Sequence, residues 1–109
     1  MIVKRPSIFI YTNAPAPDCL KEVCAGIEEE GVFFEVFERE KADLDTLAFD
    51  AAGDSMLGSG IGICGNHVAL QMKGIAKGKN VESYHMPTSA DCRKIGANSV
   101  RAIKKMPLK

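Results

Sequence analysis

Several features that would assign a class of function at once are missing from this chain of 109 residues. It has 14 basic and 14 acidic side chains, so no net charge attracts it to nucleic acid. It has no run of 18 apolar residues, which excludes a membrane-spanning helix. Its first six residues, MIVKRP, lack the basic-then-apolar order of a secretory signal. We therefore expect a cytoplasmic protein.

Catalytic motifs are missing as well. The sequence contains no CxxC pair, no HExxH and no serine in a nucleophile-elbow context. Neither His67 nor His85 has an obvious catalytic acid or nucleophile near it in sequence. We expect no catalytic residues and no enzymatic activity.

The four cysteines follow no regular spacing, and three of them, Cys24, Cys64 and Cys92, fall at apolar positions. Reduced thiols in the core are the expected state. Cys64 and Cys92 could gather with the two histidines around a metal, but no ligand-pair spacing supports such a site.

The stretch that is most informative runs over residues 59–72, SGIGICGNHVALQM, which contains no charged residue. The segment GIGIC (60–64) predicts a strand buried on both faces, because its apolar residues alternate with glycines. Gly65-Asn66 predicts a turn, and VALQM (68–72) predicts a strand that returns antiparallel. We expect this hairpin in the middle of a sheet that helices cover.

Residues 60–65 also match GxGxxG, the dinucleotide-binding fingerprint. That fingerprint binds pyrophosphate only where a strand leads into a helix. Because a second strand is predicted here instead, we interpret the glycines as part of a core strand and expect no nucleotide site.

The first half of the chain predicts two strand–helix units. Residues 7–12 and 32–37 predict strands, the second with Phe33, Glu35 and Phe37 on one face. Asp18 is the expected N-cap of the first helix, which Gly31 ends. The inward stripe of that helix is expected to be Leu20, Val23, Cys24 and Ile27.

A second helix is predicted from the Asp43 cap to Gly53, with Leu44, Leu47, Ala48 and Ala51 facing inward. Residues 74–80 predict a basic loop and residues 81–86 a short strand. Thr88 or Ser89 caps a last helix, with Lys104 and Lys105 in its final turn before Pro107. Its expected inward stripe is Cys92, Ile95, Ser99, Ile103 and Met106.

These elements predict one α/β domain over residues 1–109. Right-handed crossovers place the first three strands parallel in the spatial order 2-1-3, with helices on both faces. Charge is unevenly distributed along the chain. Residues 18–54 carry twelve acids and three bases, and residues 73–109 carry nine bases and two acids. The opposite charges of these two segments either cancel across one folded surface or form an acidic and a basic face for protein partners.

The unusual feature is Glu28-Glu29-Glu30, in the last turn of the first predicted helix. The helix dipole makes carboxylates unfavourable there, by about 0.3–1 kcal/mol each. At about 100° per residue, Glu29 points directly outward and Glu28 and Glu30 flank it. The turn is either a solvated helix end or an acidic surface that meets a cation or a basic groove of another subunit.

Three segments in register carry a resemblance to a known family. They are GIEEEGV (26–32), GICGNH (62–67) and RKIGANSVRAIKKMP (93–107). In this order and spacing they resemble the small (beta) subunit of the diol/glycerol dehydratase reactivating factor, a family related to the dehydratase medium subunit. The similarity extends over roughly residues 8–107.

The resemblance implies a three-layer α/β/α sandwich like that of anticodon-binding domains, with sheet order 2-1-3-4-5 and strand 4 antiparallel. It implies a non-catalytic subunit that binds a large, chaperone-like ATPase subunit, in a heterotetramer. Exchange with the homologous dehydratase subunit, and so transient contact with the dehydratase large subunit, would release damaged cobalamin. The protein would work in the cytoplasm, within or near a bacterial microcompartment.

The resemblance also implies a partner interface at Glu28, Glu29 and Glu30. Glu29 corresponds to a carboxylate that can reach a metal held by the large subunit, so Mg²⁺ bridged at the interface is expected, with no cofactor in the isolated chain. Neither nucleic acid nor membrane is an expected partner.

Other functions stay open. One is a medium-subunit-like component of the dehydratase itself. A flavodoxin-like module would need a phosphate-binding loop after the first strand, but NAPAP (13–17) lacks the glycines and hydroxyls. An anticodon-binding-like module would use the basic residues 73–109, which no aromatic stacking platform accompanies.

Overall fold

The computed structural model describes residues 5–40 and 42–109. Eight elements follow the predicted order: β1 (Ser7–Asn13), α1 (Pro17–Glu29), β2 (Phe33–Glu38), α2 (Leu44–Asp54), β3 (Ser59–Cys64), β4 (His67–Met72), β5 (Glu82–His85) and α3 (Ser89–Ile103). None of the helices in these described ranges is long and apolar enough to cross a membrane.

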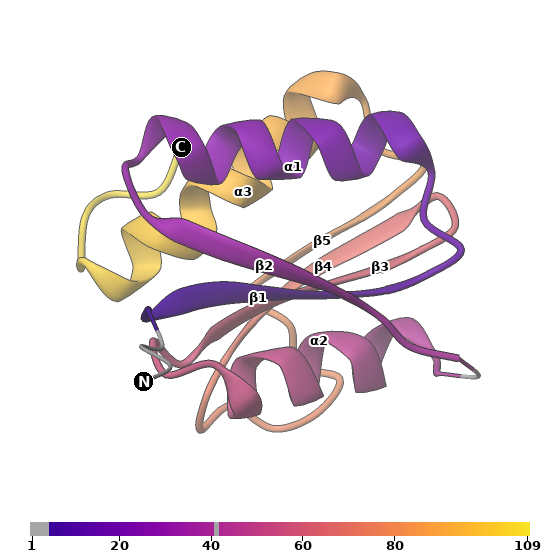
Figure 1. Ribbon diagram of the computed structural model, residues 1–109, viewed down its shortest axis with the longest axis horizontal. Coiled ribbons are helices and arrows are strands. Elements are labelled where there is room, and N and C mark those ends of the chain that lie inside the picture. Colours follow the sequence, from indigo (N-terminus) through magenta and orange to yellow (C-terminus); the bar gives the residue numbers. More distant parts are fainter. Residues whose placement is uncertain (1–4, 41) are drawn as a thin grey trace.

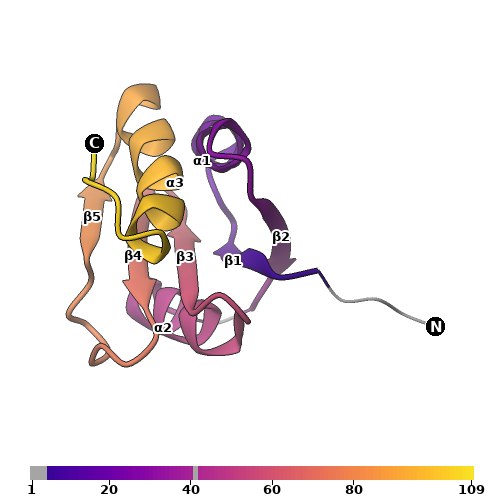
Figure 2. The same cartoon turned by 90° about the vertical axis from the view of Figure 1, so that its left-hand side faces the viewer.

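The five strands form one mixed sheet in the order β2-β1-β3-β4-β5. β1 pairs in parallel with β2 and β3, and β4 is antiparallel to both of its neighbours. Helices α1 and α3 lie side by side on one face and α2 covers the other (Figures 1 and 2). The predicted three-layer α/β/α sandwich and its strand order are confirmed.

The predicted central hairpin is β3 and β4, joined at Gly65-Asn66, and it lies inside the sheet. Residues 60–65, which match the dinucleotide fingerprint, therefore lead into a strand and not into a helix. A Cβ added at Gly60 would lie 2.2 Å from the Ala52 backbone nitrogen, and one at Gly62 would lie 2.6 Å from that of Ala48. The glycines of β3 thus allow α2 to pack directly on the sheet.

The larger apolar core lies between the sheet and the α1/α3 layer and contains Ile8, Ile10, Val23, Ile27, Ile61, Ile63, Val68, Leu70, Ile95 and Val100. Between α1 and α3 the backbones come very close. A Cβ on Gly26 would lie 2.1 Å from the Arg93 carbonyl oxygen, and one on Gly96 would lie 2.2 Å from that of Val23. These two glycines set the distance between the helices.

The buried side of α1 differs from the predicted stripe. Val23 and Ile27 are buried as expected, but Cys19 and Gly26 are buried while Leu20 and Cys24 are only partly covered. The stripe was predicted on the assumption that α1 packs only against the sheet. Because α3 packs along the side of α1, the buried arc turns toward that neighbour.

Two predicted helix ends in the first half of the chain are wrong. Helix α1 begins at Pro17 with Ala16 as its N-cap, and Asp18 lies in the first turn. The fixed φ of proline suits the first helical position, which explains the earlier start. Asp43 caps α2 through Thr46, as predicted, but the helix continues past Gly53 to Asp54.

The end of α3 is also earlier than predicted. Thr88 forms a capping box with Asp91, but the helix stops at Ile103, and Lys105 has a φ of 56°. Lys104 is the C-cap and Met106 is 40% exposed. The chain has therefore left the helix before Met106 and Pro107, so Met106 does not extend the inward stripe.

Candidate partner interface

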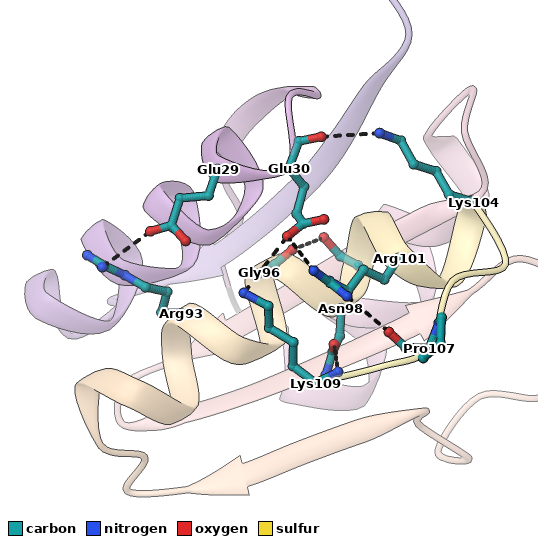
Figure 3. Close-up of polar contacts among 10 residues, drawn as sticks. Glu29, Glu30, Arg93, Gly96, Asn98, Arg101, Lys104, Pro107 and Lys109 are labelled. Atoms are coloured by element: carbon teal, nitrogen blue, oxygen red, sulfur yellow. Dashed lines mark hydrogen bonds and ion pairs between the residues drawn. The ribbon is translucent and has the colours of Figure 1, made fainter.

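The three carboxylates at the end of α1 do not form one outward-facing group. Glu28 and Glu29 are exposed, whereas the side chain of Glu30 is only 11% exposed. Glu30 is the C-cap of the helix, and its side chain turns toward α3 (Figure 3). The predicted outward direction of Glu29 is compatible with this arrangement; of the two carboxylates expected to flank it, Glu28 is exposed and Glu30 is largely covered.

Glu29 forms an ion pair with α3. Its Oε1 lies 3.2 Å from an Arg93 guanidinium nitrogen, and its side chain is 46% exposed. The same guanidinium lies 2.9 Å from Glu22, about two turns earlier on α1. Because both partners are well exposed, the Glu29–Arg93 pair stabilises the fold by about 1 kcal/mol or less. A partner can therefore approach Glu29 without breaking a strong contact.

Glu30 is more firmly held. Its carboxylate lies 3.2 Å from Arg101 and 3.9 Å from the Lys109 ammonium, and its carbonyl oxygen accepts a hydrogen bond of 3.2 Å from Lys104 (Figure 3). Arg101 also donates to the Pro107 carbonyl, and the Lys109 backbone N–H donates to Asn98. The last residues of the chain are thus fastened onto the end of α1.

These pairs explain how α1 tolerates acids at its carbonyl end. Arg93, Arg101 and Lys104, all from α3 or its cap, bring positive charge to the same turn. Three of the twelve acids of residues 18–54, Glu22, Glu29 and Glu30, are therefore paired with bases of residues 73–109. Glu28 has no ion-pair partner within residues 5–40 and 42–109, so it and Glu29 give the turn its remaining negative surface.

A metal at Glu29 would need ligands from another molecule. Within the described ranges, no three side chains of His, Cys, Asp or Glu are grouped so that they could hold a metal ion. Glu29 can supply one oxygen to a cation, and both Mg²⁺ and Ca²⁺ favour such oxygen ligands. The role of Glu29 as a metal ligand stays a prediction.

The four residues considered as metal ligands separate into two places. His67 and His85 are direct neighbours on β4 and β5, with their Nδ1 atoms 2.8 Å apart. Cys64 lies opposite His67 on β3 but packs against the apolar residues under α2. Cys92 is on the other face of the sheet, in the α1/α3 core. The predicted four-residue combination is not formed.

Cys92 instead meets Cys19, with the two sulfur atoms 2.9 Å apart. Both thiols are buried at the start of α1 and α3, beneath a hollow of about 380 Å³ that Asn66 and Thr88 help to line. Burial raises the pKa of both thiols, and for Cys19 the neighbouring thiol adds to the effect. These cysteines are therefore protonated at neutral pH, as expected for reduced core thiols.

Sequence reasoning did not identify the basic residues that organise the acidic turn. Arg93 and Arg101 lie on α3, about seventy residues from their acidic partners. The one available signal was the opposite charge of the two halves of the chain, which indicates attraction but not which residues meet.

The family is shown by comparison with known proteins. Residues 5–109 match the family model described as dehydratase medium subunit. The chain belongs to this dehydratase medium-subunit family.

Three proteins to which the chain is similar are reactivating factors or a subunit of one. The chain is 31% identical over 106 residues to the propanediol dehydratase-reactivating factor small subunit of Citrobacter freundii, covering 95% of this chain and 90% of that protein. A solved glycerol dehydratase reactivase superposes with a TM-score of 0.89 at 25% identity, covering 95% of this chain and 96% of that one. A diol dehydratase-reactivating factor complexed with ADP and Mg²⁺ also superposes with a TM-score of 0.89, at 26% identity, covering 97% of this chain and 99% of that one. These matches confirm the resemblance and support a reactivase role.

Proposed function

We propose that this protein is the non-catalytic small subunit of a chaperone-like reactivating factor for diol or glycerol dehydratase. The observation that carries the proposal is the likeness to a reactivating-factor small subunit over nearly the whole of both chains. The ATPase activity would reside in a large partner subunit, with which this chain forms a heterotetramer. The ADP and Mg²⁺ named for one solved relative support nucleotide chemistry in such an assembly.

The mode of action we propose is subunit exchange. The chain matches a family model named for a dehydratase subunit, and its similar curated relative is a reactivating-factor subunit. Two proteins with the same fold can present the same docking surface to a common partner. The small subunit would take the place of the homologous dehydratase subunit, contact the dehydratase large subunit transiently and let damaged cobalamin leave. This would take place in the cytoplasm, within or near a microcompartment.

The exposed part of the acidic turn supports an interface with the large subunit. Glu28 and Glu29 project from the end of α1, and Glu29 is held only by the weak pair with Arg93. Glu30 would act indirectly, since its contacts with Arg101 and Lys109 fix the turn. On docking, the Glu29 carboxylate would bind a basic group or Mg²⁺ held by the large subunit, either in place of Arg93 or together with it.

Glu29→Gln tests this interface. We expect affinity for the large subunit to fall about 10- to 100-fold, the range for a lost charge-assisted contact, with the larger loss when Mg²⁺ is present. Stability of the free subunit should change by less than about 1 kcal/mol, because only an exposed pair is lost. Affinity with and without Mg²⁺ and a thermal melt of each variant are the measurements.

Glu28→Gln is the matched control, because Glu28 is also exposed on the same turn, and it should bind within about threefold of wild type. Glu30→Gln is unsuitable as a control, since it removes the partner of Arg101. If Glu29→Gln bound the large subunit like wild type under both conditions, the turn would be a solvated helix end. If the wild-type chain instead replaced the medium subunit in an active dehydratase, it would be a component of the dehydratase itself.

A further inference from the structure

The imidazoles of His67 and His85 form a pair on strands β4 and β5, apart from the elements that form the acidic turn. They are the only two histidines of the chain. His67 opens β4 and His85 ends β5, and the two are directly opposite in the antiparallel register. Opposite residues of an antiparallel pair project from the same face, so the backbone holds both rings together.

The geometry of the pair is open to solvent. The Nδ1 atoms lie 2.8 Å apart, and the ring centroids are separated by 4.2 Å with the rings tilted by 41°. In the metal-free protein one Nδ1–H donates to the other Nδ1, which leaves the pair satisfied. His67 is half-buried and His85 is exposed, so a cation can reach both nitrogens from solvent.

This spacing is close to that of two adjacent ligands of one metal. With a metal–nitrogen bond of about 2.0–2.1 Å, nitrogens at a right angle are about 2.9 Å apart, whereas tetrahedral nitrogens are about 3.3 Å apart. The observed 2.8 Å fits the right-angle arrangement of square-planar or octahedral ions. Imidazole nitrogen is a suitable ligand for Cu²⁺ and Ni²⁺, which favour that geometry.

We propose that His67 and His85 form a two-imidazole chelating site for a divalent transition metal of the Cu²⁺ or Ni²⁺ type. Water fills the remaining coordination positions, because no third His, Cys, Asp or Glu of the described ranges joins a metal-binding group. Cys64 is opposite His67 on the next strand, but it is not grouped with the two histidines as a possible third ligand.

Metal binding at this pair has a structural consequence. β5 has only four residues and lies at the edge of the sheet, paired with β4 alone. A metal that joins His67 to His85 would fasten this edge strand to its neighbour. Because the metal would bind the folded state and not the unfolded chain, the free energy of unfolding rises with the logarithm of the metal concentration.

Titration of the full chain with Ni²⁺, followed by calorimetry and by the melting temperature, tests the site. Wild type should bind one Ni²⁺ and melt at a higher temperature as Ni²⁺ is added. His67→Asn and His85→Asn should each lose about tenfold or more in affinity, and the double variant should be little worse than either, because one remaining imidazole cannot chelate. Cu²⁺ should behave in the same way, and Zn²⁺ should bind more weakly.

Each variant should melt like wild type in the presence of a chelator, which shows that the fold is intact. Cys64→Ser should bind Ni²⁺ like wild type; weaker binding would overturn the two-imidazole assignment. Wild type that binds two Ni²⁺ ions, with each single variant binding one at unchanged affinity, would show independent surface histidines and overturn the chelating site. Absence of saturable binding by wild type would do the same.

Discussion

Gly62 is the residue on which the packing of α2 depends. It lies in the middle of β3, where an added Cβ would meet the Ala48 nitrogen at 2.6 Å and the Leu47 Cβ at 2.9 Å. Real side chains are rarely that close to backbone atoms, so any larger residue forces α2 away from the sheet. Gly53, in α2 itself, has no atom within 4 Å of an added Cβ.

We predict opposite results for these two glycines. Gly62→Val should destabilise the protein by about 1–3 kcal/mol, because it overpacks the contact with α2. Gly53→Ala should stabilise it by about 0.5–1 kcal/mol, because alanine is favoured over glycine within a helix. Urea unfolding of both variants measures the difference, and a Gly62→Val variant as stable as wild type would contradict the close packing described for β3.

The buried thiols predict a dependence of stability on pH. The pKa of Cys19 and that of Cys92 are raised, first by burial, so the folded state keeps its thiol protons at a pH where the unfolded chain releases them. The stabilisation that these protonated thiols contribute is therefore fully present below the ordinary thiol pKa of about 9. It is lost as the pH rises above that value. Above pH 9 the unfolded state binds fewer protons than the folded state, so the free energy of unfolding falls as the pH rises.

Replacing one of these thiols should flatten that slope. Between pH 9 and 10, one titrating thiol contributes up to about 1.4 kcal/mol per pH unit. Cys19→Ala should lower the free energy of unfolding at pH 7.5 but reduce its decline toward pH 10. Parallel curves for wild type and Cys19→Ala, from urea unfolding at each pH, would show that this thiol does not resist ionisation in the folded state.

At the scale of elements, the α1–α3 contact positions the acidic turn. Gly26 and Gly96 bring the helix backbones together, and this closeness lets Arg93 and Arg101 reach Glu29 and Glu30. If the two helices moved apart, each could still cover the same face of the sheet, but the ion pairs at the end of α1 would be stretched.

Gly26→Ala tests this contact. The added Cβ would lie 2.1 Å from the Arg93 carbonyl oxygen, which cannot move without its helix. We expect a loss of about 1–3 kcal/mol, against the gain that the same substitution gives at Gly53. A melt of Gly26→Ala that matched or exceeded wild type would mean that α1 and α3 are not held at the distance described here.

The same scale explains what the sequence alone could predict. Strand and helix positions depend on local periodicity, and all eight elements were found from it. The prediction for α1 was less accurate because its buried arc depends on α3. Helical spacing gave no sign that Glu30 is covered, because Glu30 is the C-cap and its side chain pairs with Arg101 of α3. The Glu30–Arg101 and His67–His85 contacts join residues from different elements, and no local pattern specifies them.

For the whole molecule, the acidic and basic segments of the sequence meet where α1 packs against α3, through Glu22, Glu29 and Glu30. At the end of α1, Glu28 and Glu29 stay exposed, and Figure 3 shows Glu29 beside Arg93 there. The strand order expected from the family likeness holds for the whole sheet, and the crossover rule alone predicted its parallel part. The matches to reactivating factors extend over the same residues, so fold and family are supported together.

The contact between α1 and α3 also has a consequence for synthesis of the protein. The second element, α1, packs against α3, which comes more than sixty residues later in the chain, and Glu30 is held by Arg101 of α3. While the chain is still growing on the ribosome, α1 has no α3 to pack against, and its acidic turn has no fixed shape. A partner that recognises this turn would therefore bind only chains in which α3 has already been made and packed on α1.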